Sequence, residues 1–219
     1  GRGVSEVTTP EELADADLAI VVNPNNPDGR LLAREEIVEL GARMASRGGM
    51  LVVDEAFMDV GPEEASVGCE VSLLPIVVLR SFGKFYGLAG ARLGFAIASP
   101  EVASRLSDQL GPWAVSGPAL AIGIEALGDA AWRMAMRQRL EAESQRLDDL
   151  ILQSGLTPYG GTHLFRFARG RHAGAVHRAL GGEGIFVRAF EAIPNALRFG
   201  VPGDESAWAR LEEALSRWT

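Results

Sequence analysis

The chain has 219 residues, enough for one large domain or two small ones. Hydrophobic residues make up 47% and charged residues 23%, an ordinary globular composition that excludes a wholly disordered or collagen-like chain. The net charge of −8 argues against a nucleic-acid partner, and no apolar run is long enough to predict a membrane-spanning helix. The single cysteine, Cys69, excludes an internal disulfide and a cysteine-based zinc site, which fits the cytoplasmic location that we expect.

The first half of the chain alternates short apolar runs with helical patterns. The apolar runs predict buried strands over residues 18–22, 50–53, 75–79 and 93–98. Apolar residues at helical spacing predict a helix over 33–47, and Pro100 marks the start of another. Buried strands separated by helices are typical of α/β domains, so we expect a mostly parallel sheet sandwiched by helices.

From residue 129 the pattern is that of a smaller α+β domain. A long charged helix is predicted over 129–153, and we interpret it as a bridge. Strand patterns follow at 163–167, 184–188 and 195–200, with helices near 171–180 and over 204–218. We therefore expect a large domain, residues 1–128, followed by the bridging helix and small C-terminal domain, residues 129–219.

Polar residues follow the predicted strands at their carboxyl ends, where parallel sheets bind ligands. The turn Asn23–Gly29 (NPNNPDG), which includes Asn26, follows the first strand, and Asp54 ends the second. A carboxylate at the end of a buried strand is costly unless it is paired. Asp54 is therefore either a cap for the next segment or the partner of a cationic ligand atom, and Glu55 should point the other way.

A lysine follows the third strand within a phrase rich in glycine and aromatic residues. Lys84 ends the phrase SFGK, and Phe85 and Tyr86 come directly after it. A lone lysine is usually a solvated surface charge, but a lysine in apolar surroundings has its ammonium form disfavoured and becomes a usable nucleophile. Ser81 and Arg92 would suit a phosphate, through a hydroxyl and a guanidinium group.

Together these phrases resemble the fold-type I pyridoxal-phosphate enzymes of the class I/II aminotransferase group, from about residue 18 to the end. The resemblance is carried by NPNNPDG at 23–29, DEAF at 54–57, SFGK at 81–84, GARLGF at 90–95 and NALR at 195–198. It implies pyridoxal 5′-phosphate as the cofactor and a homodimer as the assembly.

The resemblance also implies a role for each candidate residue. Lys84 would form the Schiff base with the cofactor and later move protons. Asp54 would pair with the pyridinium nitrogen, and Asn26 would hydrogen-bond the phenolic oxygen of the ring. Ser81 and Arg92 would hold the cofactor phosphate.

Two arginines near the C-terminus are the candidates for binding the substrate. Arg198 resembles the family's substrate-carboxylate arginine, and Arg188 is a candidate for a second anion. We therefore expect a small phosphorylated amino acid as the substrate, and neither nucleic acid nor a membrane as a partner.

One departure from the aminotransferase pattern bears on the reaction. Phe57 stands where those enzymes usually carry a tyrosine. Within the histidinol-phosphate-aminotransferase-like enzymes, the phrase DEAF looks closest to the L-threonine-O-3-phosphate decarboxylases of cobalamin biosynthesis, which release carbon dioxide and leave 1-aminopropan-2-yl phosphate. An aminotransferase such as that for histidinol phosphate is the alternative.

Three other interpretations follow from the sequence. The family's N-terminal segment is apparently missing before Gly1, so a folded but catalytically incomplete fragment is a second alternative. The spacing Ser81-x-x-Lys84 also matches penicillin-binding enzymes, but no Lys-Thr-Gly follows, and that serine should open a helix. The three histidines are not spaced for a metal site, so we expect no metal.

Overall fold

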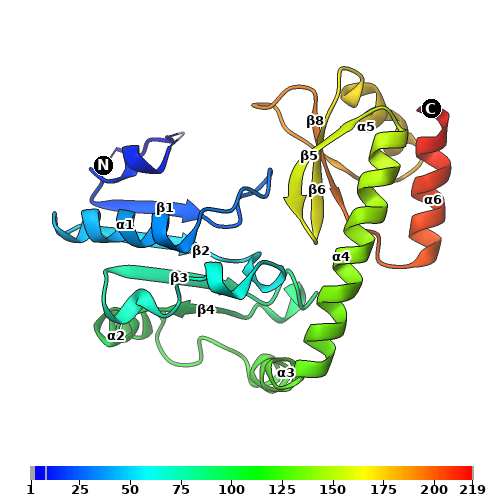
Figure 1. The fold of residues 1–219 in the computed structure, drawn as a ribbon. Helices are drawn as coiled ribbons and strands as arrows, with labels where there is room; N and C mark the ends of the chain where they lie inside the picture. Colours follow the sequence, from blue (N-terminus) through cyan, green and yellow to red (C-terminus); the bar gives the residue numbers. More distant parts are fainter. Residues whose placement is uncertain (1–2, 8, 219) are drawn as a thin grey trace. The chain divides into compact units, whose positions relative to one another are not determined.

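The computed structural model describes residues 3–7 and 9–218. It divides into two compact units (Figure 1). The first unit holds the chain up to Asn25 together with Leu31–Gly128. The second holds Asn26–Arg30 together with the chain from Asp129 onward.

A four-stranded sheet in the order β1-β2-β3-β4 forms the first unit. Strands β1 (Leu18–Val22), β2 (Met50–Asp54) and β3 (Ile76–Ser81) are parallel, and β4 (Gly94–Ile97) is antiparallel to β3. The predicted α/β fold with a mostly parallel sheet is therefore confirmed. Since Val22 pairs with Asp54 and Asp54 with Leu79, the carboxyl ends of the three parallel strands share one edge.

Helix α1 covers one face of this sheet. It places Ile37, Leu40 and Met44 against the inward side chains of β1, β2 and β3. On the other face of β1, Ile20 remains 62% exposed. The helices of the unit are α1 (Arg34–Ala45), α2 (Pro100–Leu110) and α3 (Gly117–Gly128), with 3-10 turns η1 (Pro10–Leu13), η2 (Met58–Val60), η3 (Glu63–Ala65), η4 (Glu70–Ser72) and η5 (Ala89–Ala91).

The second unit is an α+β arrangement around an antiparallel sheet in the order β5-β6-β8-β7. Its strands are β5 (Thr157–Thr162), β6 (Phe165–Arg169), β7 (Arg188–Ala189) and β8 (Ala196–Gly200). Its helices are α4 (Ala130–Gln153), α5 (Ala173–Gly182) and α6 (Glu205–Leu215), followed by the 3-10 turn η6 (Ser216–Trp218).

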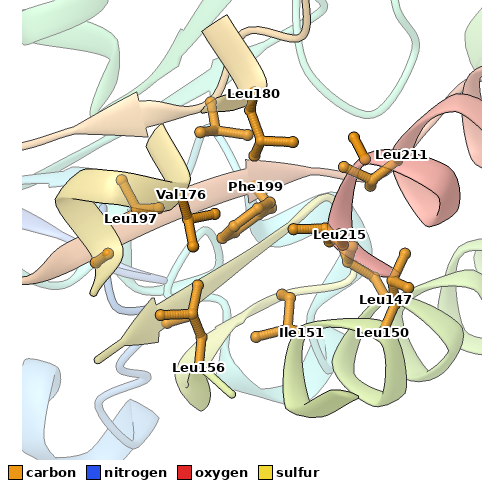
Figure 2. Packing of buried hydrophobic residues seen from close by; sticks show 14 of the residues in the cluster. Leu147, Leu150, Ile151, Leu156, Val176, Leu180, Leu197, Phe199, Leu211 and Leu215 are labelled. Carbon is orange, nitrogen blue, oxygen red and sulfur yellow. The ribbon is translucent and has the colours of Figure 1, made fainter. Parts of the chain in front are cut away.

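The core of the second unit lies between one face of its sheet and the three helices. Figure 2 shows Phe199 of β8 amid Ile151 of α4, Val176 of α5 and Leu215 of α6. Strand residues alternate between faces, so Leu197 and Phe199 face this core while Arg198 points to the other side. The face without helices is therefore the one that carries the predicted arginines.

The strand expected over 184–188 is wrong for most of its length, because only Arg188–Ala189 forms the strand β7. Gly184 has φ of +70°, and the N–H of Ile185 donates to the carbonyl of Leu180 at 2.8 Å. These residues complete the end of α5 instead of extending a strand.

Candidate active site

Asp54 and Ser81 emerge on one face of the first sheet, at adjacent strand ends. Asp54 pairs with Leu79, and Ser81 is two residues further along β3, so both side chains have the same orientation. Asp54 is half-buried, and one of its carboxylate oxygens accepts the N–H of Ala56 at 3.0 Å. The Ser81 hydroxyl oxygen accepts the N–H of Gly83 at 3.2 Å. The edge of the sheet therefore presents a carboxylate beside a hydroxyl group.

Lys84 lies in the loop that joins β3 to β4. The loop is closed at its base, where the N–H of Phe82 donates to the carbonyl of Leu93 at 3.2 Å. Phe82 and Phe85 are buried, whereas the Lys84 side chain is exposed and its Nζ lies 5.4 Å from the centroid of the Phe57 ring. The neighbours Phe82 and Phe85 are apolar and buried, as expected. The amine itself is exposed, with the aromatic ring of Phe57 on one side.

Arg92 ends the same loop in the left-handed region, with φ of 53°. Such a conformation is uncommon for a residue other than glycine and often marks a functional position. The Arg92 side chain is exposed and donates to the carbonyl of Ala89 at 3.2 Å. Two residues later, Gly94 pairs with Ser81 across the β3–β4 ladder. The loop therefore ends with Arg92 close in sequence to the residue that pairs with Ser81.

The donor set of the first unit suits one kind of ligand. An amine, a carboxylate, a hydroxyl and a guanidinium group come from the ends of β2 and β3 and from a single loop. They match a molecule with an electrophilic carbon, a basic nitrogen and a phosphate. By its chemistry, this set fits pyridoxal phosphate.

Asn26 and Arg198 lie together in the second unit. The segment Asn26–Arg30 approaches β5 so closely that a Cβ atom on Gly160 would overlap the carbonyl oxygen of Asp28. A guanidinium N–H of Arg198 donates to the side-chain oxygen of Asn26. This hydrogen bond fixes the orientation of the amide and leaves its NH₂ group available as a donor.

Arg188 and Arg198 sit directly opposite each other on β7 and β8. Arg198 lies over the ring of Phe165 at 5.1 Å, and Arg188 lies over that of Phe190 at 5.7 Å. Burial lowers the pKa of Arg198, and the charge of Arg188 lowers it further. Among the described residues, no ion pair to a carboxylate involves either arginine. Two like charges facing each other favour a bound anion.

A third arginine on this face was not predicted. Arg169 ends β6, and its guanidinium lies 4.3 Å from the ring centroid of Tyr159 and 5.7 Å from that of Phe167. The alternation of Phe165, Phe167 and Arg169 along one strand was the signal that could have placed it with Arg198.

The structure also bears on the alternative chemistries. Ser81 ends a strand, whereas the serine of the penicillin-binding pattern should open a helix. Within residues 3–7 and 9–218, histidine, cysteine and acidic side chains form no group of three suited to a metal ion. No helix in the described part of the chain is both apolar enough and long enough to cross a bilayer.

Comparison with known proteins adds a family and several relatives. A family model described as "Aminotransferase class I and II" matches residues 8–215. The threonine-phosphate decarboxylase of Pseudomonas aeruginosa is 45% identical over 98% of this chain and 64% of that protein. The threonine-phosphate decarboxylase of a Sinorhizobium species is 42% identical over 94% of this chain and 64% of that protein. The chain thus spans 64% of the length of these curated relatives.

The chain also resembles solved structures, and one of them contains bound cofactor. The histidinol-phosphate aminotransferase from Sinorhizobium meliloti, in complex with pyridoxal-5′-phosphate, superposes with a TM-score of 0.83 at 25% sequence identity. The match covers 93% of this chain and 57% of that one.

Proposed function

Because the chain belongs to the aminotransferase class I and II family, we propose that it carries the pyridoxal-phosphate site of a threonine-phosphate decarboxylase. The reaction would release carbon dioxide from L-threonine O-3-phosphate and leave 1-aminopropan-2-yl phosphate, as a step of cobalamin biosynthesis. The observation that carries the proposal is the facing pair Arg188 and Arg198, which suits a substrate with two anionic groups. The 45% identity to a named threonine-phosphate decarboxylase supports it.

Each candidate cofactor-binding residue would then have one task. When bound, pyridoxal phosphate supplies an electron sink for a bond at the substrate Cα. The Lys84 amine would carry the cofactor covalently and move a proton at Cα. Asp54 would hold a proton on the ring nitrogen, and Ser81 and Arg92 would bind the phosphate oxygens. Asn26 would donate from its NH₂ group to the phenolic oxygen, with its carbonyl held by Arg198.

The two arginines Arg188 and Arg198 would decide the reaction type. They would set the pose of the substrate, and this pose would decide which bond at Cα the cofactor acts on. Arg188 and Arg198 would hold a carboxylate and a phosphate at once, which fixes the pose at two points. Histidinol phosphate has only the phosphate, so the paired arginines suit threonine phosphate better than this amino donor, whereas 2-oxoglutarate, the second substrate of the aminotransferase, also has two anionic groups.

A second candidate is an aminotransferase such as that for histidinol phosphate. It is supported by the match to the Sinorhizobium meliloti aminotransferase, with its TM-score of 0.83. The cofactor-binding residues would serve both reactions equally. Phe57 counts against this candidate, because the aminotransferases usually have a tyrosine at its position.

Two incubations of the purified holoenzyme distinguish these functions. We expect carbon dioxide with threonine phosphate, and no glutamate with histidinol phosphate plus 2-oxoglutarate. The opposite pattern would assign the aminotransferase. The variant Lys84→Ala is the control, since either activity should vanish in it. Absence of cofactor absorbance in the wild-type chain after pyridoxal phosphate is added would favour the incomplete fragment.

We further propose a cytoplasmic homodimer, on the strength of the family resemblance. Light scattering after size-exclusion chromatography measures the assembly. A mass of twice the chain is the expected result, and a monomer that retains full activity would contradict the dimer.

A further inference from the structure

A buried group of charges lies behind the ends of β2 and β3. Glu55 is completely buried and accepts three hydrogen bonds, from the hydroxyl of Ser66 at 2.7 Å, the N–H of Val67 at 2.9 Å and Arg80 Nη1 at 2.8 Å. The second terminal nitrogen of Arg80, Nη2, donates to Asp59 at 2.6 Å. The buried carboxylate therefore has the paired and hydrogen-bonded environment that a charge inside a protein requires.

The position of this group relative to the candidate cofactor ligands follows from the alternation of strand side chains. Glu55 comes directly after Asp54, and Arg80 comes directly before Ser81. Consecutive side chains point to opposite faces, so the ion pair lies on the reverse side of the two backbone segments that present the ligands. The Glu55 N–H also donates to the carbonyl of Leu79 at 2.9 Å, so backbone and side chains join the strands at the same place.

We propose that Arg80 and Glu55 act as positioning residues, which hold the ends of β2 and β3 at a fixed spacing and so aim Asp54 and Ser81 at the cofactor. The proposal rests on the proposed function of the first unit. Burial alone would lower the pKa of Arg80, but Asp59 and Glu55 outweigh that effect and raise it, so the guanidinium stays charged. Its two terminal nitrogens donate to two carboxylates on different segments, and the single ammonium nitrogen of a lysine does not reproduce this planar, two-point geometry.

A purely structural role is the competing explanation, and a second ion pair in the same unit supplies the control. Arg34 of α1 pairs with Glu70 of η4, two elements that carry none of the candidate cofactor ligands. If ion pairs only stabilise the unit, Arg34→Lys and Arg80→Lys should both lower the melting temperature and leave the geometry of the cofactor site alone. If Arg80 positions the ligands, only Arg80→Lys should change how the cofactor is held.

The experiment compares the two variants as holoenzymes. For Arg80→Lys we expect the dissociation constant of pyridoxal phosphate to rise about tenfold, because a displaced ligand loses its aligned contacts. The visible circular dichroism of the bound cofactor should weaken, and kcat should fall with little change in KM. Arg34→Lys should leave the dissociation constant within about twofold of the wild type, since a partly exposed ion pair contributes little.

A wild-type dissociation constant and wild-type circular dichroism in Arg80→Lys would overturn the proposal. Should that variant not fold, Asp59→Asn carries the test, because it removes one of the two carboxylates that orient the Arg80 guanidinium and so loosens its pairing with Glu55. A measurable loss of cofactor affinity in Asp59→Asn supports the proposal, and an unchanged affinity refutes it. If instead the wild-type protein shows no borohydride-reducible cofactor on Lys84, the proposed function fails, whatever Arg80 does.

Discussion

Replacing Arg188 with glutamine should weaken substrate binding and leave the stability of the substrate-free protein nearly unchanged. Arg188 and Arg198 face each other on neighbouring antiparallel strands, a position in which like charges destabilise the sheet by about 0.2–1 kcal/mol. Burial and the charge of Arg188 lower the pKa of Arg198, so the folded protein already disfavours this pair of charges. Glutamine also loses the contact of Arg188 with the Phe190 ring, which contributes about 0.5 kcal/mol at an exposed site, so without substrate Arg188→Gln should stay within about 0.5 kcal/mol of the wild type.

Substrate binding should weaken in the same variant. A hydrogen bond between charged groups contributes about 1.5–3 kcal/mol, and glutamine keeps a donor but loses the charge. The dissociation constant for threonine phosphate should rise roughly 10- to 150-fold, by the usual conversion of free energy to affinity. Urea unfolding of the substrate-free protein measures the first effect, and titration of the holoenzyme with threonine phosphate measures the second.

Arg169→Gln is the matched control, since Arg169 lies on the same sheet and also contacts an aromatic ring, that of Tyr159, but pairs with Ala196 and not with an arginine. Its loss should lower stability by about 0.5–1 kcal/mol, the value of a cation–π contact, and leave substrate affinity nearly unchanged. The reasoning would be refuted if Arg188→Gln lost more than about 1 kcal/mol of stability without substrate and bound threonine phosphate as well as the wild type does.

The remaining predictions concern the lysine, the aspartate of β2 and a helix cap. Lys84→Ala should leave no protein labelled after borohydride reduction with pyridoxal phosphate, and labelling that persists would move the attachment to another amine. Asp54→Asn should slow turnover by orders of magnitude with little change in melting temperature, because the electron sink weakens; unchanged turnover would count against a ring-nitrogen partner there. Asp204 caps α6, and hydrogen bonds from the N–H of Ala207 and the hydroxyl of Ser206 lower its pKa below the usual 3.8. The stabilisation of α6 by this cap is therefore complete above the usual pKa and is lost as the pH falls through the lowered pKa. Acid unfolding followed by circular dichroism should show this loss in the wild type and not in Asp204→Ala.

The strands of the first unit were predictable from their apolar runs, but their expected burial is wrong for β4, which is exposed along its length, and for one face of β1, where Ile20 is 62% exposed. A run such as Leu18–Val22 between breakers is too short for a helix and too apolar for a loop. Helix α3 was not predicted, because Gly117–Gly128 begins with Gly-Pro and is apolar on most of its surface, so it has no polar face to give a period.

Strand β5 was missed for a tertiary reason. Pro158, Gly160 and Gly161 are poor strand residues, and local propensity argues against a strand there. Gly160 is needed because the segment Asn26–Arg30 passes so close that no Cβ fits. The same approach brings Asn26 to Arg198. The close packing that requires glycine in β5, and so makes the strand hard to predict, therefore also assembles this part of the candidate site.

The polar residues at the ends of β2 and β3 are divided between the two faces of the sheet. Alternation turns Asp54 and Ser81 to one face and Glu55 and Arg80 to the other, so each strand end supplies one candidate ligand and one half of a buried ion pair. The outward pair could be predicted from chemistry alone, since a carboxylate after a buried strand needs a partner. The inward pair required the structure, because only the fold shows that Asp59 and Ser66 complete it. In the proposed site, the support for each candidate ligand would therefore come from the residue next to it in the sequence, Glu55 beside Asp54 and Arg80 beside Ser81.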